Sequence, residues 1–194
     1  MDMPSLIAVG VFVLLAAYIL YRTHSRIVVT GNEAEQALAS VDVQLRKRHD
    51  LIPQVVATAR KFMIHEAALL ERLTELRAKA AASYDKTKAG EVAAHLEAER
   101  ALQSEFRQLF SLAEGYPELK SDESMTRVQD TLEEVEGNIA AARRYYNASV
   151  MQHRNVIQTF PGNIIAPQMG AVPFPYFETE ENTRGVVDVA RHFG

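Results

Sequence analysis

The chain has 194 residues, with 21 Lys and Arg against 25 Asp and Glu and a formal net charge of −4 at pH 7. This balance excludes a global positive field that would attract nucleic acid, so we expect no nucleic-acid partner. Cysteine is absent, which excludes disulfide frameworks and cysteine metal sites. The length suits one modest domain that buries a core, together with one further segment.

That further segment is an unbroken apolar run at residues 6–21, LIAVGVFVLLAAYILY. With the residues just before it, the run reaches the roughly 17–20 residues that a helix needs to cross a bilayer. A cleaved signal peptide and a buried core helix are the alternatives, and neither fits the flanking residues or the all-round apolar character. We therefore predict a transmembrane helix over residues 5–21, after a short extracytoplasmic N-terminus of residues 1–4. The membrane-spanning side chains are expected to be Leu6, Ile7, Val9, Val11, Phe12, Val13, Leu14, Leu15, Ile19 and Leu20.

Basic residues flank only the C-terminal side of this run, where Arg22 and Arg26 stand. The positive-inside rule then predicts that the N-terminus lies outside and that the rest of the chain lies in the cytoplasm. No ionisable residue occurs within the run, so a transport or proton-relay role has no support.

Residues 22–161 predict an all-α antiparallel bundle of three long helices, because apolar residues recur at alternating steps of three and four, as in a heptad seam. The first helix is predicted over residues 38–80, about 60 Å long at 1.5 Å per residue. Pro53 predicts a kink or a short break within it. Arg48 and Glu66 occupy seam positions, where charged groups tolerate burial only when they are paired.

The second helix is predicted over residues 91–114, after a turn at residues 86–90, and Tyr116 and Pro117 follow a glycine that ends it. The third is predicted to begin after an N-cap at residues 121–122.

Phe160 and Pro161 are expected to end the third helix. Short connections make successive helices antiparallel neighbours, so the tail after the third helix is expected to start at the membrane-distal end.

Residues 162–194 are predicted to form an irregular C-terminal tail, because prolines at 167, 173 and 175 oppose a continuing helix. An aromatic cluster of Phe174, Tyr176 and Phe177 follows. The tail either lies extended over a groove of its own bundle or binds a neighbouring subunit. Both arrangements predict that Phe174 and Phe177 are buried.

Several polar residues are expected to serve packing. The charge cluster at residues 46–50 contains Arg48, His49 and Asp50, and two interpretations apply to it: contact with anionic lipid or nucleic acid, or a solvated face from which Arg48 and Asp50 pair with adjacent helices. The second is favoured because the cluster lies about 25 residues beyond the anchor, well over a Debye length from the membrane surface. Tyr146 is predicted to be a core residue whose hydroxyl needs a partner, and Asn147 and His153 to make interhelical hydrogen bonds.

The sequence contains few residue patterns that are typical of a catalytic or metal site. His65 and Glu66 begin a zinc-protease pattern, but Leu69 stands where the second histidine is required. Glu91 and His95 lack the spacing of di-iron bundles, and His95 is interpreted as a polar surface residue. No glycine-rich phosphate loop and no Gly-x-Ser-x-Gly motif occurs. We therefore expect no catalytic, cofactor or metal residues.

The chain resembles the LemA family of bacterial membrane proteins. The resemblance is carried by the stretches VDVQLRKRHDLIP at residues 41–53, AEGYPELK at residues 113–120 and ARRYYN at residues 142–147, and by later matches that include YFE at residues 176–178. It implies an N-terminal transmembrane helix in the bacterial inner membrane and a cytoplasmic bundle of long helices. One departure is a polar pair, Arg191 and His192, near the end of the tail. The residues of these motifs that we expect to carry structure are Arg48, His49, Asp50, Pro53, Glu66, Tyr116, Pro117, Arg143, Tyr146, Asn147, Phe160 and Pro161.

The family resemblance brings no established catalytic residues. A related magnetosome protein takes part in forming an intracellular membrane compartment, which by analogy implies a membrane-organising role. The first hypothesis is a non-enzymatic scaffold that self-associates, because residues such as Val56, Met63, Leu70 and Phe110 exceed what a three-helix core requires. The second is an adaptor that binds a cytoplasmic or membrane partner, such as a protease or signalling protein, and the third is an enzyme with an unrecognised site.

Overall fold

The computed structural model describes residues 3–178, and every regular element among them is helical. The all-α prediction is therefore confirmed for this part of the chain. Predictions for residues 1–2 and 179–194, including the polar pair near the end of the tail, lie outside the described residues. The elements are α1 (Met3–Phe62), η1 (Ile64–Glu66), α2 (Ala67–Ala80), α3 (Ala89–Ala113), α4 (Pro117–Lys120), α5 (Glu123–Gln158), α6 (Gly162–Ile165) and η2 (Ala166–Met169).

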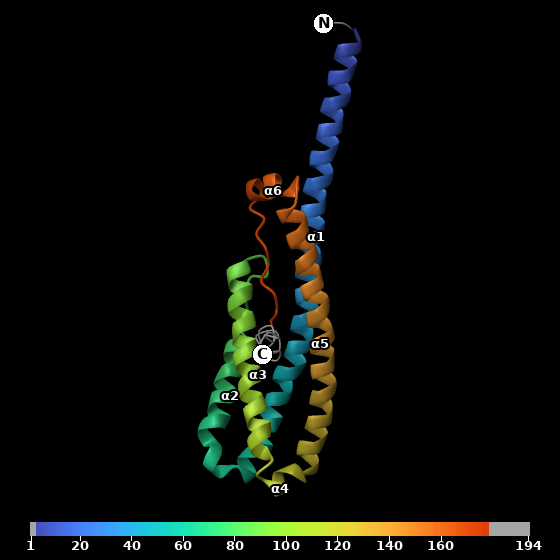
Figure 1. Cartoon of the computed structure of the whole chain (residues 1–194). Coiled ribbons are helices and arrows are strands. Elements are labelled where there is room, and N and C mark those ends of the chain that lie inside the picture. Colours follow the sequence, from blue (N-terminus) through green and yellow to red (C-terminus); the bar gives the residue numbers. More distant parts are fainter. Residues whose placement is uncertain (1–2, 179–194) are drawn as a thin grey trace, which may run out of the picture.

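Helix α1 is continuous from the apolar run into the bundle, and its N-terminal part projects beyond the other elements (Figure 1). All ten predicted membrane-spanning side chains are exposed, from Leu6 to Leu20. By length and composition this helix can cross a membrane. One face of α1 becomes buried just beyond the run, beginning with half-buried Thr23 and buried Ile27. The same helix thus passes from an apolar, exposed rod into the core of the bundle with no linker.

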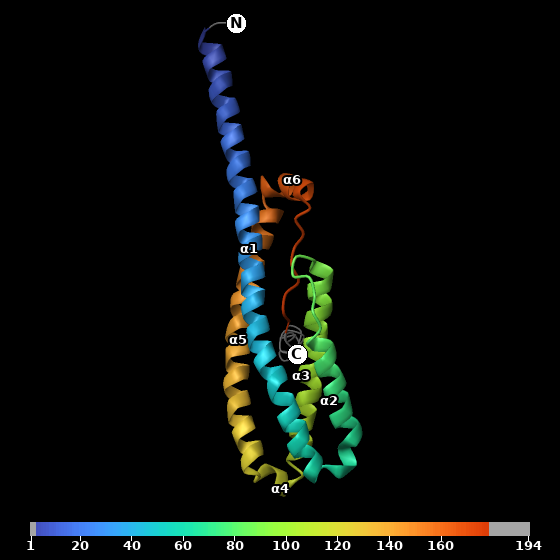
Figure 2. The same ribbon diagram turned by 180° about the vertical axis from the view of Figure 1, so that it is seen from behind.

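Four long helices, not three, alternate in direction: α1 runs away from the projecting end, α2 returns, α3 runs away and α5 returns (Figures 1 and 2). The single helix predicted over residues 38–80 is wrong, because the chain reverses at Met63–Glu66 between α1 and α2. Met63 is fully buried at this reversal. The basic residues Arg60 and Lys61 occupy the last turn of α1, where their positive charges interact favourably with the negative end of the helix dipole. Of the kink or short break predicted at Pro53, the break is wrong, since α1 continues through Pro53 to Phe62.

The apolar seam itself is confirmed as the buried face. Two hydrophobic clusters fill the bundle, one around the α1–α2 reversal and one further along α1 toward the projecting end. Because α2 folds back, it covers apolar positions that a three-helix bundle would expose. The buried seam residues of α1 are Leu38, Val41, Leu45, Arg48, Ile52, Val55 and Ala59.

The connections between the later helices follow the predicted signals. Pro117 occupies the first turn of the short helix α4, with half-buried Tyr116 before it. Asp122 caps α5 by accepting hydrogen bonds from the backbone N–H groups of Ser124 and Met125, at 2.9 and 3.0 Å. The N-cap prediction at residues 121–122 is therefore confirmed, at Asp122.

The end of α5 lies beside the projecting part of α1, where Ile27, Ile157 and Ala166 form a third small core. The predicted position of the tail at the other end of the bundle is wrong, because the additional reversal before α2 inverts the direction of every later helix. Residues 162–169 are also not irregular: they form α6 and η2, which lie across this end of the bundle (Figure 1).

Candidate functional site

The charge cluster of α1 centres on Arg48, a fully buried guanidinium that joins three helices. Its Nη2 donates to Glu99 Oε2 on α3 at 2.6 Å, and its Nη1 donates to Glu136 Oε1 on α5 at 3.2 Å. The Arg48 side chain is 2 % exposed and the Glu99 side chain 0 %, whereas the Glu136 side chain is 35 % exposed. A buried charge survives only with such partners, so the expectation that Arg48 is paired is confirmed.

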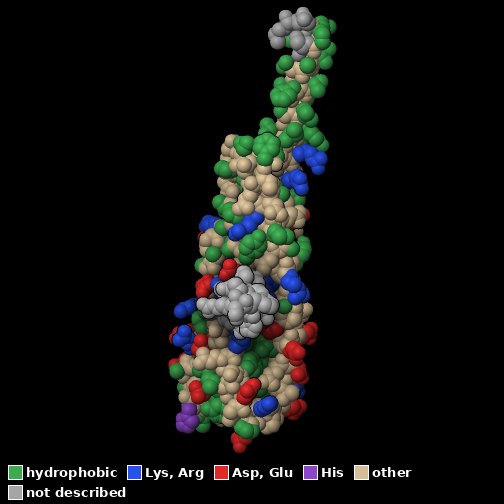
Figure 3. Space-filling model, viewed as in Figure 1, with side chains coloured by type: hydrophobic (Ala, Val, Ile, Leu, Met, Phe, Trp, Pro, Cys, Tyr) green, Lys and Arg blue, Asp and Glu red, His purple; other side chains and the backbone are tan. Residues whose placement is uncertain are grey.

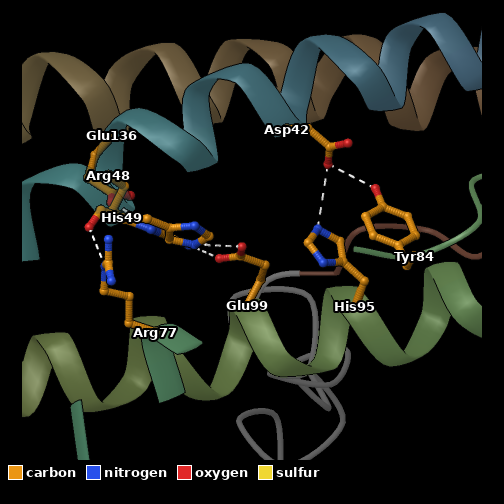
Figure 4. A network of polar contacts seen from close by, with 8 residues as sticks. All are labelled: Asp42, Arg48, His49, Arg77, Tyr84, His95, Glu99 and Glu136. Carbon is orange, nitrogen blue, oxygen red and sulfur yellow. Dashed lines mark hydrogen bonds and ion pairs between the residues drawn. The ribbon is translucent and has the colours of Figure 1, made fainter. Parts of the chain in front are cut away.

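His49 and Glu99 form the second contact of this cluster (Figure 4). His49 Nε2 lies 2.8 Å from Glu99 Oε1, but neither atom makes a hydrogen bond of acceptable geometry. The contact is therefore an ion pair only when the imidazole is protonated. Glu99 thus places one oxygen on the guanidinium of Arg48 and the other beside the imidazole of His49.

Pro53 explains a third contact. In an α-helix the carbonyl of residue 49 accepts from the N–H of residue 53, and proline has no N–H. Arg77 on α2 supplies the missing donor: its Nε donates to the His49 backbone oxygen at 2.7 Å. The return of α2 alongside α1 therefore allows α1 to continue through a proline.

One end of α3 carries a separate polar group around Asp42 of α1. Tyr84 donates its hydroxyl to Asp42 Oδ1 at 2.8 Å, and Lys86 pairs with the other carboxylate oxygen. His95 stacks on Tyr84 with ring centroids 4.0 Å apart, and its side chain is 8 % exposed, so the interpretation of His95 as a surface residue is wrong. Burial raises the pKa of Asp42, but contacts with His95, Lys86 and Tyr84 outweigh burial and hold that pKa below its ordinary value. Burial, together with the Asp42 charge, raises the pKa of Tyr84.

These two groups flank an open cleft of about 310 Å³ between α1, the end of α2, the α2–α3 loop and α3. Asp42, His49 and Glu99 line it together with the cations Arg46, Arg77 and Lys86. Cations and carboxylates are balanced, and several are already engaged: Lys86 pairs with Asp42, Glu99 binds Arg48, and Arg77 donates to a backbone carbonyl. Such a lining suits a polar contact surface better than a site for one strongly charged ligand.

No cluster of three or more His, Asp or Glu residues that would hold a metal ion occurs in residues 3–178. The candidate groups for proton transfer are His49 and His95, and each faces a carboxylate. Of the cleft residues that carry a hydroxyl or an amine, Tyr84 donates to Asp42 and Lys86 pairs with the same carboxylate.

The tail is held by α5 through its backbone. Tyr146 donates its hydroxyl to the Pro175 carbonyl at 2.7 Å. Asn147 exchanges two hydrogen bonds with the backbone of Phe177, at 2.9 and 3.0 Å, much as a neighbouring strand would. Arg154 donates twice to the Phe174 carbonyl, at 3.0 and 3.2 Å.

These contacts confirm that Tyr146 is a core residue with a partnered hydroxyl and that Phe174 and Phe177 are buried, at 6 % and 3 % exposure. The docking occurs within one chain. The interhelical bond predicted for Asn147 goes to the tail instead of to a helix.

His153 makes the predicted interhelical contact, with its Nδ1 3.0 Å from the Thr30 hydroxyl of α1. Burial lowers the pKa of His153, although a backbone contact from Val172 acts in the opposite direction. The folded protein therefore favours the neutral imidazole.

Other predicted residues lie apart from the cleft group. Asp50 is exposed and lines the edge of the cleft. Glu66 is half-buried and lies in the turn between α1 and α2, not in the apolar seam of a helix. Arg143 lies near Phe177, with its guanidinium carbon 5.9 Å from the ring centroid. Phe160 and Pro161 form the corner between α5 and α6.

Sequence reasoning missed Glu99, Arg77 and Asp42. Glu99 falls on the apolar stripe of α3 between Leu96 and Leu102, so a charged residue on a buried face was the available signal.

The model of the LemA family matches residues 37–190. The matched region begins on the bundle part of α1 and contains the charge cluster, the cleft and the docked tail. No curated protein matches the chain.

Proposed function

The chain belongs to the LemA family, and from that premise we propose that it is a non-enzymatic, single-pass membrane protein that scaffolds or organises the bacterial inner membrane. The N-terminus is outside and the helical bundle is in the cytoplasm. The apolar, exposed start of α1 and the basic residues Arg22 and Arg26 behind it support this orientation.

The observation that carries the proposal is the continuity of α1. One helix of 60 residues contains both the anchor and the central helix of the bundle. A flexible linker would let the bundle rotate freely, whereas a continuous helix sets its height and tilt relative to the bilayer. A rigid body held in one attitude at a membrane is suited to organising other components there.

We also propose that the chain self-associates, but not through the surplus apolar residues of the bundle. The surplus apolar residues that favoured it are largely buried within one chain: Val56, Met63 and Leu70 are 7 %, 0 % and 1 % exposed. Among the described residues, most of the exposed large hydrophobic side chains lie in the anchor, so we propose that copies associate through their anchors in the bilayer.

Cysteine labelling tests the topology, because the chain has no native cysteine. In intact cells a membrane-impermeant maleimide should label Asp2→Cys, and it should label Ser83→Cys only after lysis. The reverse pattern would exclude the proposed orientation. Crosslinking and native mass spectrometry in membranes test self-association, and a strictly monomeric chain would contradict the scaffold.

The second candidate is an adaptor, which the open cleft between α1 and α3 favours. A photo-crosslinking residue at Ser83, on the cleft wall, should then capture one specific protein in cells, whereas the same residue at exposed Ile64, at the α1–α2 turn, should not. Equal capture at both positions would count against a role for the cleft.

A further inference from the structure

We propose that the chain contacts the bilayer at a second place, the α5–α6 cap, defined as residues 155–172. There the exposed side chains Phe160 and Ile164 enter the boundary between headgroups and acyl chains of the membrane that the anchor crosses. This inference rests on the proposed function, because it requires the anchor to span the bilayer.

The cap lies beside the first turns of α1 that follow the apolar run. A recess of about 180 Å³ is lined by Thr23 and Arg26 of α1 on one side and by residues 155–156 and 159–162 on the other. At about 1.5 Å per residue, Thr23 and Arg26 lie only about 3 and 8 Å along the helix axis beyond Tyr21, the last residue of the apolar run. The cap therefore lies at the level where the anchor leaves the membrane.

The cap is packed directly against α1. Ile27 of α1 packs with Ile157 and Ala166 of the cap in a separate small core. Both ribbon views show α6 lying across the end of the bundle, next to the emerging anchor (Figures 1 and 2). The cap is thus held at a fixed height relative to the anchor.

The cap exposes large apolar side chains and carries no charged side chain. Phe160, Ile164 and Val172 are 79 %, 55 % and 51 % exposed. No Asp, Glu, Lys or Arg occurs from residue 155 to residue 177. Hydrophobic side chains gather on this end of the surface, with basic side chains beside them at the base of the anchor (Figure 3). Exposed apolar patches of this kind mark interaction surfaces.

A lipid surface is the occupant that these observations favour over a protein. The patch lies at the level where the exposed apolar surface of the anchor ends, across the recess that Thr23 and Arg26 line. Arg22 and Arg26, exposed at the same level, suit anionic headgroups. Phe160 and Ile164 thus insert into the headgroup boundary of the bilayer, as the apolar faces of amphipathic helices do.

The chain has no Trp, so single Trp variants report cleanly. The full-length variant Phe160→Trp is reconstituted into vesicles of brominated phosphatidylcholine and phosphatidylglycerol. Its emission should be blue-shifted, and bromine should remove about half of it, as expected for a side chain about 5–10 Å deep in the interface. The matched control is Ile64→Trp, which is 73 % exposed at the opposite end of the bundle and should show neither effect.

Leu14→Trp, within the anchor, separates the two proposals. If bromine quenches neither Leu14→Trp nor Phe160→Trp, the anchor does not span the bilayer and the proposed function fails with this inference. If bromine quenches Leu14→Trp and not Phe160→Trp, only the second contact is excluded. A blue shift of Phe160→Trp without quenching, dependent on the protein-to-lipid ratio, would assign the patch to a second copy and overturn the lipid contact.

A second readout avoids the intrinsic preference of Trp for interfaces. Ile164 and Ile64 are both exposed in the protein, at 55 % and 73 %. Once the membrane is dissolved and the chain is unfolded in urea, Ile164→Cys and Ile64→Cys should react with a water-soluble maleimide at comparable rates. In vesicles we expect Ile164→Cys to react at least about tenfold more slowly than Ile64→Cys, the factor for a difference of about 1.4 kcal/mol in access. Equal rates in vesicles would overturn the proposal.

Discussion

The hydrogen bond from Arg77 to the His49 carbonyl should stabilise the fold because Pro53 removes the normal helical donor. Arg77→Met keeps an unbranched apolar stem and deletes the donor. The substitution removes the 2.7 Å hydrogen bond from Arg77 Nε to the His49 carbonyl oxygen. That oxygen, which lies in the partly buried contact between α1 and α2, then has no donor. An unsatisfied buried acceptor costs about 1–3 kcal/mol, and we expect the free energy of unfolding to fall by about 2 kcal/mol.

The decisive comparison repeats this substitution in a Pro53→Ala background. There the backbone N–H of residue 53 is restored and can donate to the His49 carbonyl, so loss of Arg77 should cost well under 1 kcal/mol. The two substitutions should therefore be coupled by at least about 1 kcal/mol. Pro53→Ala alone should not destabilise the helix, because Ala has the higher helix propensity.

Urea unfolding of the full-length chain in nanodiscs, followed by circular dichroism, measures these differences. The control is Arg72→Met on the same helix, whose guanidinium is 68 % exposed and lies 3.4 Å from Glu105. A surface pair of this kind contributes about 0–1 kcal/mol, with no coupling to Pro53. If Arg77→Met costs the same in both backgrounds, within about 0.5 kcal/mol, the proposed role of Pro53 is refuted.

Three further predictions concern buried groups. Glu99→Gln leaves the buried Arg48 guanidinium facing only the half-buried Glu136 carboxylate, so the free energy of unfolding should fall by about 3–5 kcal/mol. Glu136→Gln should lower it by about 1 kcal/mol or less. Equal losses in urea unfolding would contradict the cluster geometry. Because the pKa of His153 is lowered on folding, the unfolded chain binds more protons, so stability should fall as pH drops below about 6.5. His153→Gln should flatten this slope, and an unchanged slope would exclude the assignment. Gly162→Ala places a Cβ against the Val156 carbonyl and should cost about 1–3 kcal/mol in thermal unfolding; a wild-type melting curve would show that the corner relaxes freely.

Several features of the fold were predictable because local chemistry decides them. Asp122 caps α5, α3 ends just before the glycine and proline at 115 and 117, and the seam residues of α1 are buried. The burial of the aromatic tail was also predictable, since large apolar side chains between prolines pack against something. Its docking partner was left open between the same chain and a neighbour, and the backbone contacts from Tyr146 and Asn147 show it in the same chain.

The main error came from a seam that continues across a turn. Phe62 and Leu69 are seven residues apart, so the heptad spacing is unbroken although the chain reverses between them. No glycine or proline marks the reversal, and the basic last turn of α1 was the one local signal of an end. The candidate site was hidden for a related reason: Arg48, Glu99 and Arg77 are far apart in sequence and meet only because α2 and α3 fold back along α1.

The amino-acid sequence alone determined the helical class, the apolar N-terminal segment, the family and the identity of the buried faces, because periodicity and composition act over one or two turns of chain. Tertiary structure alone decided the number of long helices, the end of the bundle at which the tail starts, and the partners of the buried charges. Those features depend on which faces pack against each other, and a repeating apolar pattern offers the same face to more than one neighbour.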